Sequence, residues 1–519
     1  MWIKDLIRKE LGLGLGKKTK YEKSKYEGEI IFTEHHQSHA ASAFFASPFE
    51  EAAILTVDGV GEWTTTSYGY GCRNEITLTH ELKFPHSLGL LYSAFTQYLG
   101  FKVNSGEYKV MGLAPYGKPT YCDLILENLI DLKDDGSFKL NMNYFAYTYA
   151  QEMINDKFVA LFGHPPREPE AKIEQHHRDL AMSIQRVTEE VLLRTANHLH
   201  EETGQKNLCM AGGVALNSVA NGRIIRETPF EEIFIQPAAG DAGGSVGVAT
   251  FIWFHILRNK REAVHKNNPN SPTTNRSRNS SRTGLEKDLM QNSYLGPEYS
   301  REEIKRFLEE KGVVYEEFGC EEILRRTAEI IAGKRVVGWF QGRMEWGPRA
   351  LGNRSILADP RDKEMQDIVN LNIKFRESFR PFAPTVLLDK AAEYFVLDRE
   401  QQSPYMLLVT QVREEKRVIP AVTHVDGSAR VQTIAREDNP LYYDLIAEFY
   451  NLTGVPVLIN TSFNVRGEPI VCTPEDAYRC FMRTKMDDLV LGDFMMSKEE
   501  QKPVEAGENE DWQKEFRLD

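Results

Sequence analysis

The sequence lacks the features that mark membrane and secreted proteins. No apolar run reaches the ~18–20 residues that a membrane-spanning helix needs. The N-terminal residues MWIKDLIR do not contain the apolar core of a signal peptide. We therefore expect a cytoplasmic protein that does not bind membranes.

Paired cysteines and an excess of positive charge are also missing. The six cysteines are far apart and form no Cys-x-x-Cys motif, so the sequence indicates neither a zinc ribbon nor a disulfide framework. Lys and Arg number 63 against 76 Asp and Glu, so the formal net charge is −13. We expect no general binding to nucleic acid from that balance, although a local basic pocket is compatible with it.

The remaining composition is that of a globular chain with more than one core. A chain of 519 residues is expected to form two or three domains. Apolar strand candidates at 52–57 and 207–210 alternate with a helical pattern at 176–202, which predicts an α/β fold. The predicted segments are a Lys-rich N-terminus at 1–29, a first domain at 30–260, a disordered linker at 261–293, a second domain at 294–505 and a charged tail at 506–519.

Two histidines suggest a metal site in the first domain. His35 and His39 are four residues apart at the start of a predicted helix, so they share one face and could bind one divalent metal. A metalloprotease helix would need Glu at the position of His36. Asp241 could complete a three-ligand site with open positions. The alternatives are a polar helix start with scattered histidines and a helix cap at Asp241.

Three glycine-rich loops each follow a predicted strand, and these loops lie at 58–66, 211–217 and 239–247. Without side chains, their backbone N–H groups can approach phosphate oxygens. Simple accommodation of the backbone is the alternative. The candidate substrate or nucleotide contacts from these loops are Asp58, Gly212, Gly213 and Asn217, and the ordered polar loop at 104–117 adds Lys109.

The second domain is rich in arginine. Six arginines fall between residues 343 and 380, within segments that also contain Trp, Phe, Gly and Pro. Guanidinium groups bind phosphate bidentately, and ordinary surface salt bridges are the alternative. Residues 460–469 follow an apolar strand candidate, so their hydroxyls and amides are expected at a strand end, where ligands commonly bind.

Long motifs in the same order resemble one enzyme family. The resemblance is to O-carbamoyltransferases related to nodulation protein NodU, the family that includes tobramycin carbamoyltransferase. It is carried by HHQSHAASAFF at 35–45, VDGVGEW at 57–63, SGEYKVMGLAPYG at 105–117, WGPRALGNRS at 346–355 and NTSFN at 460–464.

The resemblance implies a fold and two reactions. It implies an ASKHA-like N-terminal domain, of the actin and Hsp70 type, and a YrdC-like C-terminal domain. Carbamoyl phosphate and ATP would form carbamoyl-adenylate in the YrdC-like domain, and the ASKHA-like domain would pass the carbamoyl group to a hydroxyl of a small metabolite. Fe²⁺ is the implied metal, Mg²⁺ is a further candidate ion, and a homodimer is a candidate assembly.

The resemblance also assigns roles to residues of this chain. By motif, His35, His39 and Asp241 correspond to the iron ligands. The carbamoyl phosphate and nucleotide contacts correspond to Arg349, Lys374, Arg380, Arg430 and Ser462, of which the first three are the expected catalytic residues.

The chain departs from the family pattern at its start. Family members place further strands and a phosphate-binding hairpin before the metal histidines, whereas His35 lies close to Met1 here. We expect the opening strands and a catalytic His to be absent, which leaves a non-catalytic nucleotide-binding protein as an alternative. The related hydrogenase-maturation carbamoyltransferase carries Cys-x-x-Cys zinc fingers, and this chain has none.

Overall fold

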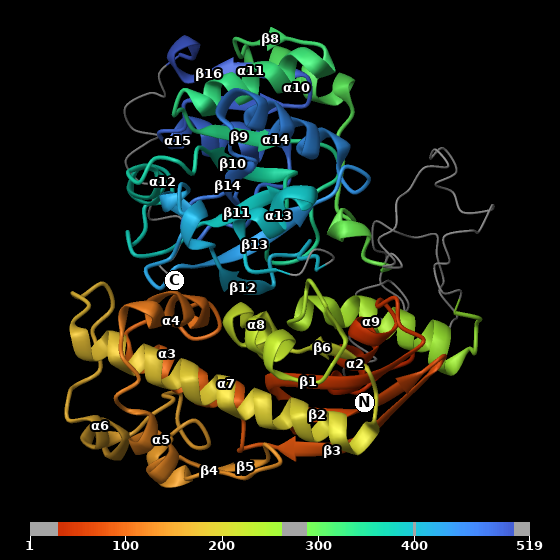
Figure 1. Cartoon of the computed structure of the whole chain (residues 1–519), viewed down its shortest axis with the longest axis vertical. Coiled ribbons are helices and arrows are strands. Elements are labelled where there is room, and N and C mark those ends of the chain that lie inside the picture. The colour runs from red at the N-terminus through yellow and green to blue at the C-terminus, as the bar shows by residue number, and fades with distance from the viewer. Residues whose placement is uncertain (1–29, 262–287, 398–400, 503–519) are drawn as a thin grey trace, which may run out of the picture.

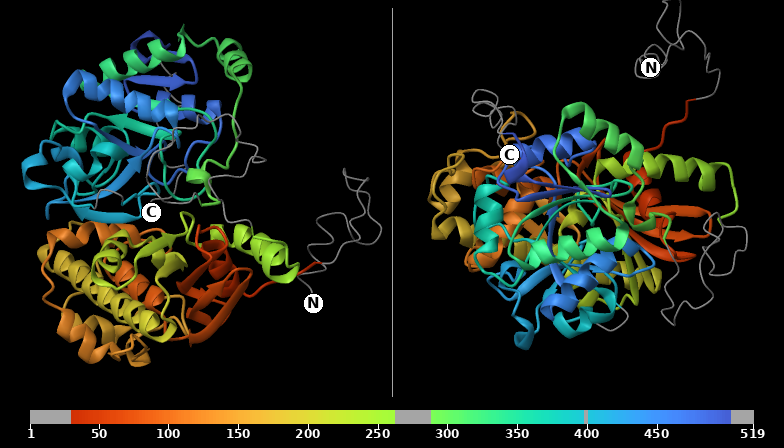
Figure 2. Two further views of the ribbon diagram at one scale, coloured as in Figure 1. Left: turned by 45° about the vertical axis from the view of Figure 1, so that its right-hand side comes forward. Right: turned by 90° about the horizontal axis from the view of Figure 1, so that it is seen from above.

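The computed structural model describes residues 30–261, 288–397 and 401–502. These residues form two halves stacked one above the other, an N-terminal half at 30–261 and a C-terminal half at 288–502 (Figures 1 and 2). Each half has its own sheet. One buried apolar cluster lies mainly in the N-terminal half and also takes in Met290 and residues 405–408, and a second lies within the C-terminal half. The mixed α/β fold expected from the alternating pattern is confirmed. The predicted Lys-rich N-terminus, most of the predicted linker and the charged tail lie outside the described residues.

The N-terminal half is built on a five-stranded sheet with the order β3-β2-β1-β6-β7. The first three strands are antiparallel neighbours, while β6 and β7 run parallel to β1. Residues 52–57, predicted as a buried strand, lie within β1 and are almost fully buried. The strands are β1 (Glu51–Gly61), β2 (Thr64–Cys72), β3 (Glu75–Lys83), β6 (Asn207–Ala211) and β7 (Glu232–Ile235), and β4 (Ile130–Leu132) pairs with β5 (Phe138–Leu140) in a small separate sheet.

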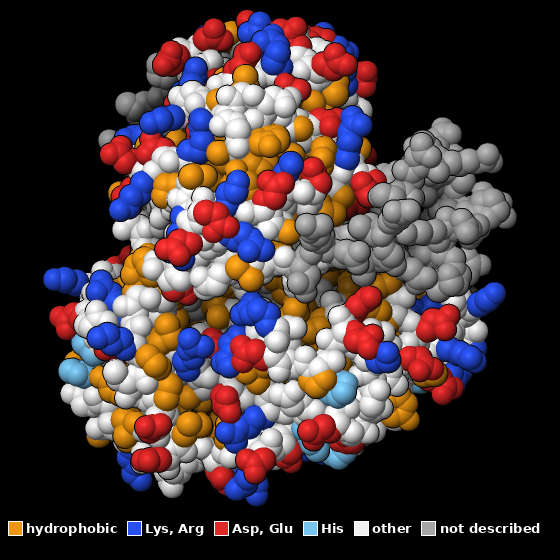
Figure 3. All heavy atoms as spheres, viewed as in Figure 1, with side chains coloured by type: hydrophobic (Ala, Val, Ile, Leu, Met, Phe, Trp, Pro, Cys, Tyr) orange, Lys and Arg blue, Asp and Glu red, His pale blue; other side chains and the backbone are white. Residues whose placement is uncertain are grey.

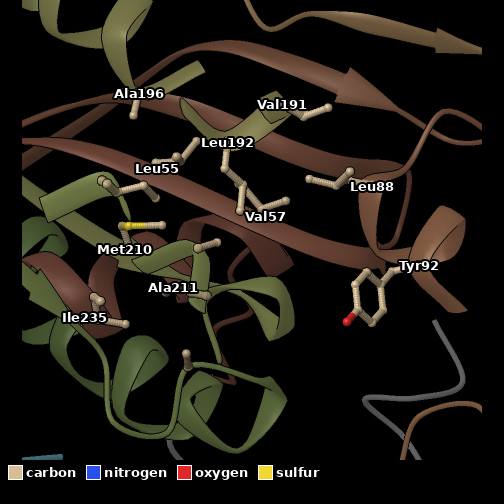
Figure 4. Close-up of a cluster of buried hydrophobic side chains, with 14 of the residues drawn as sticks. Leu55, Val57, Leu88, Tyr92, Val191, Leu192, Ala196, Met210, Ala211 and Ile235 are labelled. Atoms are coloured by element: carbon tan, nitrogen blue, oxygen red, sulfur yellow. The ribbon is translucent and has the colours of Figure 1, made fainter. Parts of the chain in front are cut away.

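Helices cover both faces of this sheet because alternate residues of β1 point to opposite sides. Leu55 and Val57 meet the buried side chains Val191 and Leu192 of α7 on one face (Figure 4). Thr56 faces α2 on the other side, where its hydroxyl contacts His36. The helices of this half are α2 (His35–Phe44), α3 (Leu88–Tyr98), α4 (Glu107–Leu113), α5 (Cys122–Asn128), α6 (Asp156–Phe162), α7 (Gln175–Thr203), α8 (Ser218–Glu227) and α9 (Gly244–Thr250). None of the helices in the described ranges is both long and apolar enough to cross a membrane.

The C-terminal half is built on a nine-stranded mixed sheet with the order β12-β13-β11-β14-β10-β9-β15-β16-β8. Its central strands are buried on both faces, as in β10 and β11. The strands are β8 (Glu316–Glu317), β9 (Val337–Phe340), β10 (Arg354–Ala358), β11 (Ala383–Leu387), β12 (Leu408–Gln411), β13 (Ser428–Ile434), β14 (Val457–Ser462), β15 (Asp488–Leu491) and β16 (Phe494–Ser497). The helices are α10 (Arg301–Lys311), α11 (Cys320–Ala332), α12 (Met365–Asn372), α13 (Leu388–Tyr394), α14 (Pro440–Thr453) and α15 (Pro474–Arg483).

The two halves meet where helix α8 covers β12, an edge strand of the larger sheet. Asn221 donates a hydrogen bond to the carbonyl of Leu407 over 3.1 Å, and Arg226 donates to that of Val409 over 3.2 Å. A Cβ atom at Gly222 would lie 2.2 Å from the carbonyl oxygen of Val409, so only glycine permits this approach. The helix therefore protects an edge that would otherwise expose unpaired backbone groups.

The predicted linker extends too far at its C-terminal end. Residues 288–293 were expected to be disordered because the segment is polar, but they have a defined place against the first core. Met290 is 1% exposed, and the carboxylate of Asp288 accepts a hydrogen bond from the Tyr405 hydroxyl. Of the two apolar side chains in this stretch, Met290 is buried and anchors it, whereas Leu289 stays exposed.

Candidate functional site

A cavity of about 1460 Å³ lies between the two halves. Its walls come from the ends of strands and from loops of both halves, including Asp58 and Asp241 on one side and Arg349, Arg430 and Ser462 on the other. On the outer face in Figure 3, basic and acidic side chains are interspersed. That face therefore carries no cluster of positive side chains like the one that lines the cavity.

Four side chains converge at the N-terminal wall of the cavity. Helix α2 begins after Glu34, whose capping box with Gln37 fixes the first turn. The helix presents His35 and His39 on one face, and their Nε2 atoms are 2.9 Å apart. The remaining two side chains of this group are Asp58 in β1 and Asp241 in the short 3₁₀ turn η4 (Asp241–Gly243).

The distances in this group fit a single metal ion. The Asp58 Oδ2 atom lies 3.0 Å from His35 Nε2 and 3.1 Å from His39 Nε2. The Asp241 Oδ1 atom lies 3.4 and 3.7 Å from the same two nitrogens. Ligands at the usual metal distance of about 2.1 Å would be roughly 3.4 Å apart in a tetrahedron. Two imidazoles and two carboxylates form a donor set that suits Fe, Zn or Mn.

Asp58 lies within hydrogen-bond distance of both histidines, whereas the sequence suggested it as a substrate or nucleotide contact. Its second oxygen, Oδ1, accepts a hydrogen bond from the backbone N–H of Gly213 over 3.1 Å, which orients the carboxylate. Burial alone would raise the pKa of Asp58, but the hydrogen bonds from His35 and His39 bring it well below its usual range. Asp58 therefore stays ionised, as a metal ligand must be.

Residues around the four side chains hold them in place. A Cβ atom at Gly61 would lie 2.2 Å from the ring of His35, so the strand end can pack on that imidazole only as glycine. His36 Nδ1 lies 2.7 Å from the Thr56 hydroxyl and anchors α2 to β1. Burial lowers the pKa of His36 to about 4, so this imidazole stays neutral. Sequence reasoning had treated His36 only as a residue standing where a protease has Glu.

The glycine-rich loop at 211–217 divides into packing and cavity residues. Gly212 has a φ of +92°, and a Cβ atom there would strike the carbonyl of Val57, so its role in the structure is close packing. Gly213 and Asn217 line the cavity. The Asn217 amide group pairs with Gln185, and Tyr92 donates a hydrogen bond to the same Gln185. Sequence reasoning missed this polar wall because Gln185 lies inside the long helix α7.

Arginines gather on the C-terminal wall. Arg349, Arg376, Arg380 and Arg430 line the cavity. Among the described residues, no ion pair involves the guanidinium of Arg349 or Arg430, and the Nε atom of each is buried without a hydrogen-bond partner. Burial lowers the pKa of Arg349 to about 10, and burial together with the repulsion of Arg349 and Arg380 lowers that of Arg430. Such a cluster is complementary to a multiply charged anion.

Lys374 supports the loop that borders this cluster. Its amine donates hydrogen bonds to the carbonyl and hydroxyl of Ser462 and to the side chain and carbonyl of Asn464. The side chain is almost fully buried, and burial, followed by repulsion from Arg376, brings its pKa well below the usual value. Lys374 therefore fixes the positions of two polar cavity residues.

The other arginines of the segment 343–380 fulfil structural roles, which was the alternative left open by composition. Arg343 donates to the carbonyls of residues 295 and 296, and Arg361 pairs with Asp359. Arg354 stacks on Phe340 at 3.5 Å and donates to several carbonyls. Only half of the six arginines between 343 and 380 therefore reach the cavity.

Lys109 lies behind the cavity wall. Its amine is buried on α4, 3.5 Å from the carboxylate of Glu377 in the other half and 5.5 Å from the ring centre of Phe101. The expected role of Lys109 as a substrate contact remains a prediction, since the structure places its charge against a protein carboxylate.

Comparison with known proteins identifies the family. The family model of the carbamoyltransferase N-terminus matches residues 4–250, and that of the carbamoyltransferase C-terminus matches residues 328–498. An uncharacterized protein of Synechocystis sp. is 55% identical, covering 96% of this chain and 80% of its own length. Nodulation protein NolO of Bradyrhizobium diazoefficiens is 37% identical, with 89% and 78% covered. The chain is a member of the carbamoyltransferase family.

Other matches are more partial. Nodulation protein NolNO of Sinorhizobium fredii is 39% identical over 93% of this chain, which spans 65% of that relative. The crystal structure of HypF from T. kodakarensis covers 45% of this chain at 14% identity with a TM-score of 0.25, a likeness too low to support an argument about fold.

The family assignment divides the cavity between two carbamoyltransferase regions. The histidine and aspartate group lies within the residues matched by the N-terminal family model. The arginine cluster lies within those matched by the C-terminal model. The protein is therefore a carbamoyltransferase whose two regions face one cavity.

Proposed function

We propose that this carbamoyltransferase makes carbamoyl-adenylate at the arginine cluster and transfers its carbamoyl group to a hydroxyl of a small acceptor at the histidine and aspartate group. The observation that carries the proposal is the pair of half-buried arginines, Arg349 and Arg430, which line the cavity with a buried Nε atom each and no ion-pair partner among the described residues. Burying cations without counterions is costly, so the cluster fits ligands that bring several negative charges, as ATP and carbamoyl phosphate do.

The first reaction joins the two substrates. Water converts carbamoyl phosphate to carbamate and phosphate, and a carbamate oxygen then attacks the α-phosphorus of ATP while pyrophosphate leaves. Arg349, Arg380 and Arg430 would stabilise the charge that develops on the phosphoryl oxygens, because donors that are already in place need not reorganise as that charge forms. The amine of Lys374 would keep the Ser462 hydroxyl at the edge of the same cluster.

The second reaction takes place at the other wall. The acceptor oxygen attacks the carbamoyl carbon, the bond to the AMP oxygen breaks, and the hydroxyl proton leaves with AMP or with solvent. His35, His39, Asp58 and Asp241 would hold the divalent metal, which we propose is Fe²⁺. A metal bound there would act as a Lewis acid toward the carbamoyl oxygen. A shared cavity would limit hydrolysis of the adenylate between the two steps.

We also propose the finer fold assignment, ASKHA-like for the N-terminal half and YrdC-like for the C-terminal half. Support for the first comes from the order of three antiparallel strands followed by two parallel strands, with helices on both faces. Support for the second comes from the mixed sheet whose strand ends and loops present the arginines.

Measuring pyrophosphate tests the proposal. The wild type should release pyrophosphate from ATP only when carbamoyl phosphate is present. The His39→Ala variant should keep this activity, because His39 lies at the other wall, and should lose carbamoyl transfer and bound metal. Pyrophosphate release that does not depend on carbamoyl phosphate would contradict the proposed first reaction, and loss of both activities in His39→Ala would contradict the division of labour.

A further inference from the structure

The carboxylate of Glu377 lies between cations from three separate segments. It belongs to the loop between α12 and β11. Its Oε1 atom is 3.5 Å from Lys109 Nζ of the N-terminal half and 3.9 Å from Arg466 Nη2, and its Oε2 atom is 3.8 Å from Arg380 Nη1. The side chains of Lys109, Arg466 and Glu377 are 0%, 7% and 20% exposed, so water screens these charges weakly.

All three separations exceed those of well-formed charge-assisted hydrogen bonds, which are about 2.7–2.9 Å. The Oε2 atom of Glu377 is buried and has no hydrogen-bond partner among the described residues. Arg466 makes its short contact with Glu170 instead, at 2.6 Å. A carboxylate held at intermediate distances from several cations has room to move toward one of them when the charge nearby changes.

The same loop also carries the contacts that seat α4 and the following turn η1 (Ala114–Tyr116) on the C-terminal half. The guanidinium of Arg380 lies 5.0 Å from the ring centre of Tyr108, and the Tyr116 hydroxyl donates a hydrogen bond to the carbonyl of Phe379 over 3.1 Å. Arg380 and Tyr108 line the cavity, whereas Glu377 lies behind them. The loop thus has one side at the anion site and the other at α4.

We propose that Glu377 is a positioning residue that transmits occupancy of the anion site to α4. An anion in the cavity attracts Arg380 and weakens its hold on Glu377, and the carboxylate then pairs more closely with Lys109. That contact fixes α4 against the C-terminal half and closes the cavity wall while substrate is bound. The inference rests on the proposed function only in taking ATP as the anion.

Hydrogen exchange in the full-length protein tests this role. In the wild type, saturating ATP should slow amide exchange several-fold in the peptide that spans residues 107–116, because α4 opens less often when it is fixed. The Glu377→Gln variant keeps the shape of the side chain but loses its charge. It should still bind ATP, which calorimetry on the same sample would measure, and its α4 should exchange at the ligand-free rate.

Two further variants make the result specific. Glu170→Gln removes another carboxylate that joins the two halves, but one that is 49% exposed, and it should keep the slowing by ATP. Lys109→Met removes the opposite charge and should lose the slowing as Glu377→Gln does, with no further loss in the double variant.

The proposal is overturned if Glu377→Gln or Lys109→Met retains the slowing, or if ATP slows nothing in the wild type. Pyrophosphate release by the wild type is measured in parallel and tests the proposed function alone. A catalytically active protein without the exchange effect would therefore disprove the role of Glu377 and leave the proposed reactions standing.

Discussion

Replacing Arg349 with methionine should stabilise the ligand-free protein while it weakens substrate binding. Burial lowers the pKa of Arg349 from 12.5 to about 10, which reflects the cost of holding its charge in the cavity wall. At 1.36 kcal/mol per pKa unit, that shift corresponds to roughly 3 kcal/mol. Because the side chain lines a solvent-filled cavity, screening reduces the cost to about 1–2 kcal/mol.

Methionine is close to arginine in length and carries no charge, so Arg349→Met should recover most of this cost. A gain of 1 kcal/mol raises the melting temperature by about 2–4 °C for a domain of this size, so a rise of roughly 2–8 °C is expected. Losing one charge-assisted contact, worth about 1.5–3 kcal/mol, should weaken binding of ATP or carbamoyl phosphate by roughly 10- to 150-fold.

Scanning calorimetry in phosphate-free buffer and titration calorimetry would measure both quantities. Arg343→Met is the matched control, since Arg343 is exposed and its guanidinium, among the described residues, donates to the carbonyls of residues 295 and 296. The control should bind both ligands normally and should not gain stability. A lower melting temperature with unchanged binding in Arg349→Met would show that Arg349 has a structural role and would refute the reasoning.

Three other changes probe separate parts of the structure. Asp58→Asn should remove most of the bound metal found by elemental analysis, whereas the neighbouring Glu62→Gln should retain it; equal loss in both would exclude Asp58 as a specific ligand. Burial lowers the pKa of the His177 imidazole to about 4. As the pH falls, the imidazole therefore takes up a proton more readily in the unfolded chain than in the folded one. The free energy of unfolding should fall by about 2–3 kcal/mol between pH 6.5 and 4. His177→Gln should flatten that dependence in denaturant titrations, and an unchanged slope would contradict the assignment. Gly222→Ala should lower stability by about 1–3 kcal/mol in calorimetry, because its Cβ would strike the carbonyl of Val409; wild-type stability would show that the backbone there yields easily.

Local patterns predicted the parts of the structure that depend on neighbours in sequence. The apolar run at 52–57 is a buried strand as expected, although β1 continues beyond it to Gly61. The spacing of His35 and His39 placed both imidazoles on one face of α2, and the structure brings Asp241 to the same point. In each case a helical or strand repeat determines the geometry.

Features that depend on contacts distant in sequence could not be predicted in this way. Asp58 reaches the histidines because β1 ends beside the first turn of α2, and no spacing rule relates the two segments. Arg349 and Arg354 are the same residue type and belong to one short motif. Arg354 nevertheless bonds to carbonyls inside the fold, whereas Arg349 lines the cavity. The sharing of Glu377 between the two halves likewise follows from how they pack.

Direct detection of carbamoyl-adenylate tests the central claim. The wild type would be incubated with ATP and ¹³C-labelled carbamoyl phosphate without an acceptor, quenched rapidly and analysed by mass spectrometry. The account predicts an adenylate that carries the label, formed together with pyrophosphate and absent in Arg349→Met. Labelled acceptor formed on later addition of a hydroxyl compound, with no adenylate at any time, would contradict it.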